Sequence, residues 1–142
     1  AMGGGMPIGA MCTSAELALT FGPGAHGSTY AGNPVACAAS YAQIGEIMDN
    51  HLPENAEKMG TYFRAKLAKL PCVKEVRGRG LMLGVEFEKE IATDLKYQAA
   101  DEGLLITAVR PGVIRLVPPL DITEKECDEA FDILNKVVSK LV

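Results

Sequence analysis

Long apolar runs are absent from this sequence of 142 residues. None approaches the ~20 consecutive apolar residues that a helix needs to span a bilayer. The start of the chain also lacks the basic segment followed by an apolar stretch that marks a signal peptide. We therefore expect a cytoplasmic protein with no membrane partner.

An excess of basic residues is absent as well. The 14 basic and 18 acidic residues give a net charge of -4 and a pI near 5.2, so no positive field is available to attract nucleic acid. The composition is 48% hydrophobic and 23% charged, which is typical of a folded globular protein with one domain or one and a fraction.

Cysteine pairs with metal-ligand or redox spacing are also missing. The sequence has no CxxC pair and no histidine at a metal ligand's spacing, so we expect no metal site. We interpret the cysteines as reduced, buried, small hydrophobic residues, while a disulfide stays open as the alternative. They are Cys12, Cys37, Cys72 and Cys127.

Glycine, in contrast, is abundant near the start of the chain. Three consecutive glycines at positions 3–5 indicate a tight turn or a close backbone approach. Residues 8–12 are apolar enough for a short strand. Thr13 or Ser14 could then cap a brief helix that ends at Leu19.

Residues 21–34 form a long loop with four glycines and two adjacent hydroxyls, Ser28 and Thr29. Loops of this length are uncommon in compact domains and are usually functional or disordered. A hydroxyl beside exposed backbone N–H groups suits a phosphate where no cationic side chain is near. A Ser-Thr pair in a turn also commonly bonds its own backbone, so a ligand site and a plain connector both remain open.

A strong helix start follows at Asn33 and Pro34, because asparagine caps helices well and proline loses no needed hydrogen bond at the first position. We expect this helix to run to about Asn50, with a run of small residues that suits close packing. His51-Leu52-Pro53 breaks it and is the candidate domain boundary. Its apolar face would consist of Cys37, Tyr41, Ile44 and Met48.

The rest of the chain predicts alternating helices and strands. Helices are expected over 54–70, 92–102 and from Thr123 onward, where Thr123 and Glu126 fit a capping box. Strands are expected over 73–77, 81–87, 104–108 and 113–117, with turns at 77–80 and 110–112. The buried face of the first of these helices would hold Ala56, Met59, Phe63, Leu67 and Leu70.

These elements predict two domains of unequal completeness. Residues 53–142 would form a small C-terminal α+β domain in which helices cover one face of a short sheet. The first fifty residues offer too little to enclose an apolar core. We therefore expect residues 1–52 to be the tail of a larger domain.

Two arginine-containing segments are further candidates for binding. The Arg-Gly-Arg-Gly segment at 77–80 could bind an anion, although solvated arginines on a glycine turn are the commoner case. Arg115 stands between Ile114 and Leu116 in an apolar strand. Its guanidinium must face solvent or an anion there, and its planar fork suits a carboxylate. An edge-strand arginine in water is the alternative.

Four segments, in this order and at these separations, resemble the C-terminal part of the class III pyridoxal-phosphate aminotransferases. They read GGGMPIGAM, HGSTYAGNPVACA, VKEVRGRGLMLGVEF and VIRLVPPLDIT, and the match covers essentially the whole chain. Within that class, the sequence of these segments is most similar to the acetylornithine aminotransferases of arginine biosynthesis. The resemblance implies a fragment of the α/β fold-type I architecture, with the tail of the large domain followed by the small domain.

The resemblance also implies roles for three residues. In the family, the threonine of the HG(S/T)T motif reaches across a homodimer interface to the cofactor phosphate of the other subunit, which assigns Thr29 to pyridoxal 5'-phosphate. Ser28 would lie at the substrate edge of the same site. The arginine that precedes the PPL motif binds a substrate carboxylate in the family, which assigns Arg115.

The family's chemistry also needs a lysine that forms a Schiff base with the cofactor. It precedes the GGG segment by three residues, so here it would fall just before residue 1, and the nine lysines present run only from Lys58 to Lys140. No catalytic residue is assigned within the chain. We expect a fragment that binds no cofactor and is inactive alone. The intact enzyme would transfer an amino group from N-acetylornithine to 2-oxoglutarate.

Two alternatives remain at this point. The intact enzyme could use ornithine, 4-aminobutyrate or succinylornithine as the amino donor, since most residues that select the donor lie outside this chain. The chain could also be a freestanding, non-catalytic assembly module that binds a partner.

Overall fold

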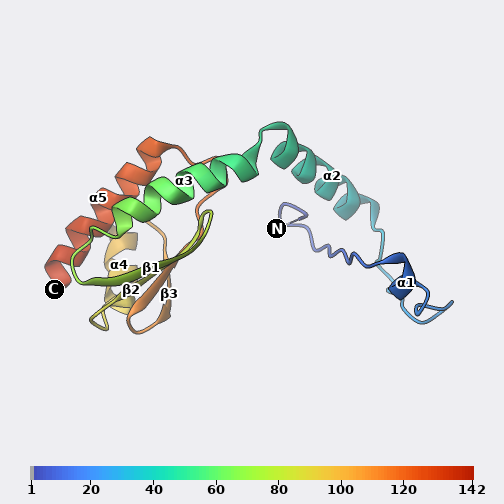
Figure 1. Cartoon of the computed structure of the whole chain (residues 1–142), viewed down its shortest axis with the longest axis horizontal. Helices are drawn as coiled ribbons and strands as arrows, with labels where there is room; N and C mark the ends of the chain where they lie inside the picture. The colour runs from blue at the N-terminus through green and yellow to red at the C-terminus, as the bar shows by residue number, and fades with distance from the viewer. Residues whose placement is uncertain (1) are drawn as a thin grey trace. The chain divides into compact units, whose positions relative to one another are not determined.

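Two helices joined by a long loop make up the first unit of the chain, which extends to Asn50 in the computed structural model (Figure 1). The structure describes residues 2–142. The glycine segment at its start forms the predicted tight turn: the Met6 N–H donates to the Gly3 carbonyl at 2.9 Å, and Gly4 and Gly5 have positive φ angles of 54° and 110°. Glycine adopts this left-handed backbone without the steric cost of a Cβ.

Helix α1 (Ala15–Ala18) is capped by Ser14, one of the two predicted residues, whose side chain accepts from the Leu17 N–H at 3.3 Å. The strand predicted over residues 8–12 was wrong, because residues 7–14 have no regular secondary structure. A strand needs a neighbour for its backbone hydrogen bonds, and the only sheet of the described residues lies in the second unit.

Helix α2 (Pro34–Asp49) begins as predicted. The Asn33 side chain accepts from the N–H groups of Val35 and Ala36, at 3.0 and 3.2 Å. The buried positions are the small residues Ala36 and Ser40, whereas the predicted apolar face is exposed in this chain. That face consists of Cys37, Tyr41, Ile44 and Met48.

The interpretation of the cysteines was only partly right. All four are free thiols, but Cys12 and Cys37 are exposed and Cys72 is half-buried. Only Cys127 is buried, and burial raises the pKa of its thiol. The first unit leaves its two cysteines uncovered because its elements enclose no apolar core within residues 2–50.

A break at His51 separates α2 from the second unit, His51–Val142. His51 has a left-handed φ of 51°, and a new helix starts at the next residue, with Pro53 in its first turn. The predicted break is therefore present. The assignment of residues 1–52 and 53–142 to a large and a small domain stays a prediction.

The second unit is a four-stranded antiparallel sheet with three helices. The strand order is β1-β2-β4-β3. Its elements are α3 (Leu52–Leu67), β1 (Val73–Arg79), β2 (Met82–Phe87), α4 (Ala92–Asp101), β3 (Thr107–Arg110), β4 (Val113–Leu116) and α5 (Glu124–Leu141).

Alternation along the central strands creates one buried and one open face of this sheet. Leu83, Val85 and Ile114 are fully buried and join the helices in a single apolar core, since successive side chains of a strand point to opposite faces. The predicted buried face of α3 is confirmed, with Phe63 and Leu67 among the most buried side chains. The helices thus occupy one face, and the other is left for residues such as Arg115.

The helix ends follow the predicted local chemistry. At α5, the Thr123 hydroxyl accepts from the Glu126 N–H at 3.3 Å, and the Glu126 carboxylate accepts from the Thr123 N–H at 2.8 Å, which completes the capping box. Gly103 follows α4 with a φ of 92°, as expected for a glycine at this position. Helix α3 ends at Leu67, before the predicted Leu70, although Leu70 is still buried.

Two strand boundaries differ from the prediction. Strand β1 continues through the Arg-Gly-Arg-Gly segment to Arg79, so the turn lies at Gly80 and Leu81 and not at 77–80. Gly78 stays in the ladder opposite Leu83 with a φ of 136°, and a Cβ at this position would overlap the Met82 carbonyl. Strand β3 begins at Thr107 rather than at residue 104.

None of the helices within residues 2–142 combines the length and the hydropathy of a membrane-spanning segment. The same residues hold no group of three or more His, Cys, Asp or Glu side chains placed to bind a metal ion.

Candidate functional site

The glycine-rich loop of the first unit borders an open cavity of about 620 Å³. Ser28 and His26 line it from the loop, and Met6 to Gly9 line it from the segment after the glycine turn. Gly24 and Gly32 have positive φ angles of 78° and 69°, which the loop requires for its turns. Thr29 is exposed beside this cavity but does not line it.

Both predicted hydroxyls are available to a ligand. The loop turns on backbone hydrogen bonds from the Ala31 N–H to the Ser28 carbonyl and from the Asn33 N–H to the Tyr30 carbonyl, each 3.2 Å long. The side-chain hydrogen bonds found within residues 2–50 do not involve Ser28 or Thr29. Neither hydroxyl therefore forms a hydrogen bond with the backbone of the loop.

This loop fits one part of a phosphate site. It supplies two hydroxyl donors, which can hold a phosphate oxygen together with backbone N–H groups. Residues 1–50 contain no lysine and no arginine, so the countercharge of a phosphate would have to come from elsewhere. The loop can therefore supply one part of a phosphate site, and other residues would supply the rest.

Arg115 lies on β4, an interior strand with β2 on one side and β3 on the other. The edge position in the alternative of an edge-strand arginine in water was therefore wrong, whereas the exposure to solvent that it expected is present. Its register partners are Gly84 and Thr107. The side chain is exposed on the open face of the sheet, and no carboxylate among the described residues forms an ion pair with it.

Arg115 lines a shallow, open groove of about 390 Å³ on this face. A second arginine, Arg79, belongs to the 77–80 segment that was a candidate for binding an anion, although a turn with solvated arginines was the commoner case. The signal was present: Arg77 and Arg79 are two residues apart, and this is the spacing that puts both on one face of a continuing strand. Both arginines line the groove.

Arg77 differs from Arg79 and Arg115 because carboxylates compensate its charge. Its guanidinium donates to the Glu86 carboxylate at 2.6 Å and to the Glu75 carboxylate at 3.0 Å. Hydrogen bonds from Lys74 and Arg77 lower the pKa of Glu86 to about 2. Arg77 is thus neutralised within the sheet, whereas Arg115 keeps its charge for a ligand.

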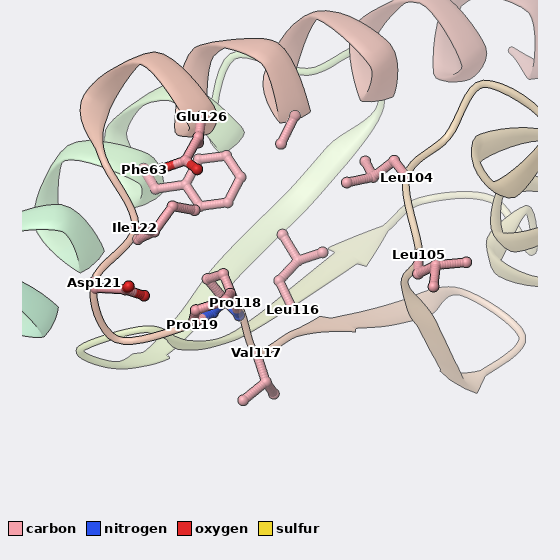
Figure 2. Close-up of a pocket in the computed structure, with 11 residues that line it drawn as sticks. Phe63, Leu104, Leu105, Leu116, Val117, Pro118, Pro119, Asp121, Ile122 and Glu126 are labelled. Atoms are coloured by element: carbon pink, nitrogen blue, oxygen red, sulfur yellow. The ribbon is translucent and has the colours of Figure 1, made fainter. Parts of the chain in front are cut away.

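A third hollow, of about 330 Å³, lies between α3, α5 and the segment after β4 (Figure 2). Its lining is mostly apolar and includes Phe63 and Leu116, with the carboxylates of Asp121 and Glu126 as its charged groups. No cationic side chain lines it. This charge pattern does not suit a carboxylate substrate, so the hollow is a weaker candidate than the Arg115 groove.

The three predicted site residues fall in two units. Ser28 and Thr29 adjoin one another in the loop of the first unit, and Arg115 occupies the sheet of the second. The first unit carries the two hydroxyl donors, and the second unit carries the guanidinium. These are the two kinds of donor that a phosphate-bearing cofactor and a carboxylate substrate require.

Comparisons with known proteins identify the class. A solved ornithine aminotransferase from Toxoplasma gondii, described as showing partial occupancy of PLP at its active site, superposes with a TM-score of 0.79 at 34% identity. The match covers 89% of this chain and 31% of that one. The architecture is that of a fold-type I aminotransferase, of which the chain covers about a third.

The family follows from the sequence. The model of the aminotransferase class-III family matches residues 1–138, and the chain belongs to this family. It is 46% identical over 145 residues to an acetylornithine aminotransferase from Methanothermobacter thermautotrophicus, and 43% identical over 142 residues to an ornithine aminotransferase from Staphylococcus carnosus. These matches cover 99% and 98% of this chain but only 37% and 36% of the relatives.

Proposed function

We propose that this chain works within a longer cytoplasmic enzyme that transfers an amino group from N-acetylornithine to 2-oxoglutarate, in arginine biosynthesis. The family supports amino-group transfer, and the similarity to an acetylornithine aminotransferase supports the donor. Four free thiols agree with a reducing compartment. The observation that carries the proposal is Arg115, an uncompensated guanidinium in a groove on the open face of the sheet.

Pyridoxal phosphate would supply the electron sink for this chemistry. The residues of this chain would hold the reactants in place. The Thr29 hydroxyl donates a hydrogen bond to the phosphate of a cofactor carried by the partner in a homodimer. Ser28 lines the substrate side of the same site. Arg115 binds the substrate carboxylate with two parallel N–H donors, which fixes its direction as well as its position.

A second donor, ornithine, is supported by the similarity to the ornithine aminotransferase of Staphylococcus carnosus. The two donors differ by an acetyl group, so a direct comparison separates them. In the whole enzyme, with 2-oxoglutarate as the acceptor, we expect a higher kcat/KM for N-acetylornithine than for ornithine. The reverse order would assign the enzyme to ornithine.

We further infer that residues 1–142 alone are catalytically inactive. All nine lysines lie at position 58 or beyond, in the second unit. Lys66 is held by Asp128 at 2.6 Å and Lys136 by Glu102 at 2.5 Å. The family pattern places the Schiff-base lysine before the GGG segment, and none of the nine lysines stands there.

Borohydride reduction of the 142-residue chain after incubation with pyridoxal phosphate tests this inference. We expect only diffuse, substoichiometric labelling of surface lysines on peptide mapping. Stoichiometric labelling of one lysine in the folded chain, together with amino-group transfer, would contradict it.

A further inference from the structure

The hollow of about 330 Å³ in the second unit is large enough for a small organic ligand, since binding pockets start at about 300 Å³. Its lining comes from α3, α5, the residues before β3 and the residues after β4 (Figure 2). Ser28, Thr29 and Arg115 do not line it. The proposed function therefore leaves this hollow without an assignment.

The hollow lies where the ladder between β3 and β4 stops. Thr107 and Arg115 are the last register partners at this end of the ladder. Leu105 and Val117, two residues beyond them, do not pair and line the hollow instead. The prolines at 118 and 119 follow, and proline has no N–H to donate to a ladder. The hollow is therefore built into the course of the backbone.

The floor of the hollow is part of the apolar core, and its rim is exposed apolar surface. Phe63 and Leu116 are 2% and 6% exposed, whereas Leu105 and Val117 are 86% and 59% exposed. Exposed apolar side chains that gather around a concave apolar floor are typical of a ligand site. The walls thus favour a ligand with a hydrocarbon body.

Two carboxylates, those of Asp121 and Glu126, are the charged side chains that line the hollow. Within residues 2–142, neither of them forms an ion pair. The lysines that meet the first turns of α5 are paired with its other carboxylates instead. These pairs are Lys58 with Glu124 at 3.3 Å, Lys66 with Asp128 at 2.6 Å and Lys125 with Glu129 at 3.7 Å.

Glu126 presents one carboxylate oxygen to the hollow in a fixed position. The Thr123 N–H and hydroxyl both donate to its Oε2, at 2.8 and 2.7 Å. These hydrogen bonds lower the pKa of Glu126, which keeps the carboxylate charged. Its Oε1 takes part in none of the side-chain hydrogen bonds found among the described residues, and neither does the carboxylate of Asp121.

The charged and the apolar groups lie on opposite sides of the hollow, as Figure 2 shows. Asp121 and Glu126 are on one side, Leu104 and Leu105 are on the other, and Leu116 lies between them. A ligand that matches this arrangement has a cation at one end and an apolar chain behind it.

We propose that the hollow binds a short aliphatic monoamine, with its ammonium at Asp121 and Glu126 and its hydrocarbon chain against Leu104, Leu105 and Leu116. The ammonium gains charge-assisted hydrogen bonds to two carboxylates. A diamine would leave its second ammonium on the apolar side without a partner. An α-amino acid would bring a carboxylate into a hollow that already holds two. The proposal does not rest on the proposed function, because it uses none of the residues given a role there.

Backbone amide NMR titrations of the 142-residue chain test the proposal. The ligands are hexylamine, hexanol and hexanoate, which share one hydrocarbon chain and differ in charge. The variants are Asp121→Asn and Leu105→Ser, with Asp132→Asn as the matched control. Asp132 is exposed on α5, has no ion pair among residues 2–142 and does not line the hollow.

We expect hexylamine to bind most tightly and hexanoate least, with amide shifts centred on Leu105, Leu116 and Ile122. Asp121→Asn should weaken hexylamine about two- to five-fold, the effect of losing one partly exposed ion pair, and should leave hexanol unchanged. Leu105→Ser should weaken hexylamine and hexanol alike, and Asp132→Asn should change neither. The amide spectra report directly whether each variant remains folded.

Three results would overturn the proposal. Hexanoate that binds as tightly as hexylamine would show that the carboxylates do not select the ligand. Equal weakening of hexylamine by Asp121→Asn and Asp132→Asn would show only a general attraction to the net charge of -4. Hexylamine shifts that are absent, or that centre outside the hollow, would show that the amine does not bind there.

Discussion

Gly60 of α3 and Gly80 of the β1–β2 turn are in backbone contact, with no room between them for a side chain. Helix and hairpin can approach this closely because position 60 is glycine, whereas glycine at position 80 suits a positive φ of 51°. Strand β1 continues through the Arg-Gly-Arg-Gly segment as far as Arg79. The turn is displaced to Gly80 and Leu81, where α3 meets it.

Replacing Gly60 should therefore destabilise the second unit. Alanine favours a helix interior over glycine by about 1 kcal/mol, but the overlap with the Gly80 backbone should outweigh that gain. We expect Gly60→Ala to lower the free energy of unfolding by about 1–3 kcal/mol, the usual range for overpacking. Urea denaturation measures it.

Gly84→Ala is the control for this prediction. A Cβ at Gly84 would lie 3.8 Å from the Arg77 Cγ, an ordinary van der Waals distance. Its stability should match that of the native chain or exceed it slightly. If Gly60→Ala is as stable as Gly84→Ala, the close contact is not rigid.

The capping box of α5 predicts a second stability change. Thr123→Ala removes the hydroxyl that bonds to both the Glu126 N–H and its carboxylate, and loss of an N-cap typically costs about 1 kcal/mol. The Thr123 hydrogen bonds also lower the pKa of Glu126, so this pKa should rise in the variant. Chemical denaturation and carboxyl NMR titration measure the two effects. Thr123→Ser should preserve both, and an unchanged Glu126 pKa in Thr123→Ala would contradict the assignment.

Lowering the pH should destabilise the folded chain by protonating Glu86. Its pKa falls from 4.5 to about 2 in the folded chain, first through Lys74 and then through Arg77. A carboxyl whose folded pKa is lowered stabilises the folded state fully above its unfolded pKa, and this contribution is lost as the pH falls through the folded value. The stabilisation from Glu86 should therefore be complete above about pH 4.5 and gone near pH 2.

Glu86→Gln isolates this contribution. The stability difference between the native chain and the variant should be largest above pH 4.5 and should vanish near pH 2, as measured by denaturation at a series of pH values. Glu90→Gln serves as the control, because Glu90 makes no ion pair among residues 2–142. A difference for Glu86→Gln that does not depend on pH would contradict the ion-pair network.

Local chemistry made several features of the fold predictable. Asn33, Ser14 and Thr123 cap helices through side-chain hydrogen bonds that span two or three residues, so the sequence around each one contains the whole interaction. The buried face of α3 was equally predictable, because its apolar residues recur with helical spacing.

Features that depend on distant partners were not predictable in the same way. Residues 8–12 have the composition of a strand but no neighbouring strand among the described residues. The glycines at 78 and 80 favour a turn locally, but Gly78 pairs with Leu83 in the ladder and only Gly80 lies in the turn, against Gly60 of α3.

In the candidate site, too, local features were predictable and relations between distant residues were not. Arg115 was identified because a charge within an apolar strand is unusual whatever surrounds it. The 77–80 segment was a separate candidate, because the relation of Arg79 to Arg115 exists only once β1, β2 and β4 are in register. The apolar face of α2 was predicted from its helical spacing. It is exposed, because no element within residues 2–142 packs over it.

The central claim is that Arg115 anchors the carboxylate of the substrate, and kinetics of the whole enzyme test it most directly. Arg115→Gln and the control Arg110→Gln would be compared by kcat/KM for the amino donor and for 2-oxoglutarate. Both substrates carry a carboxylate, so the loss of one charge-assisted contact should lower both values roughly 10- to 100-fold in Arg115→Gln alone. Values for Arg115→Gln equal to those of Arg110→Gln would show that this arginine does not bind the substrate.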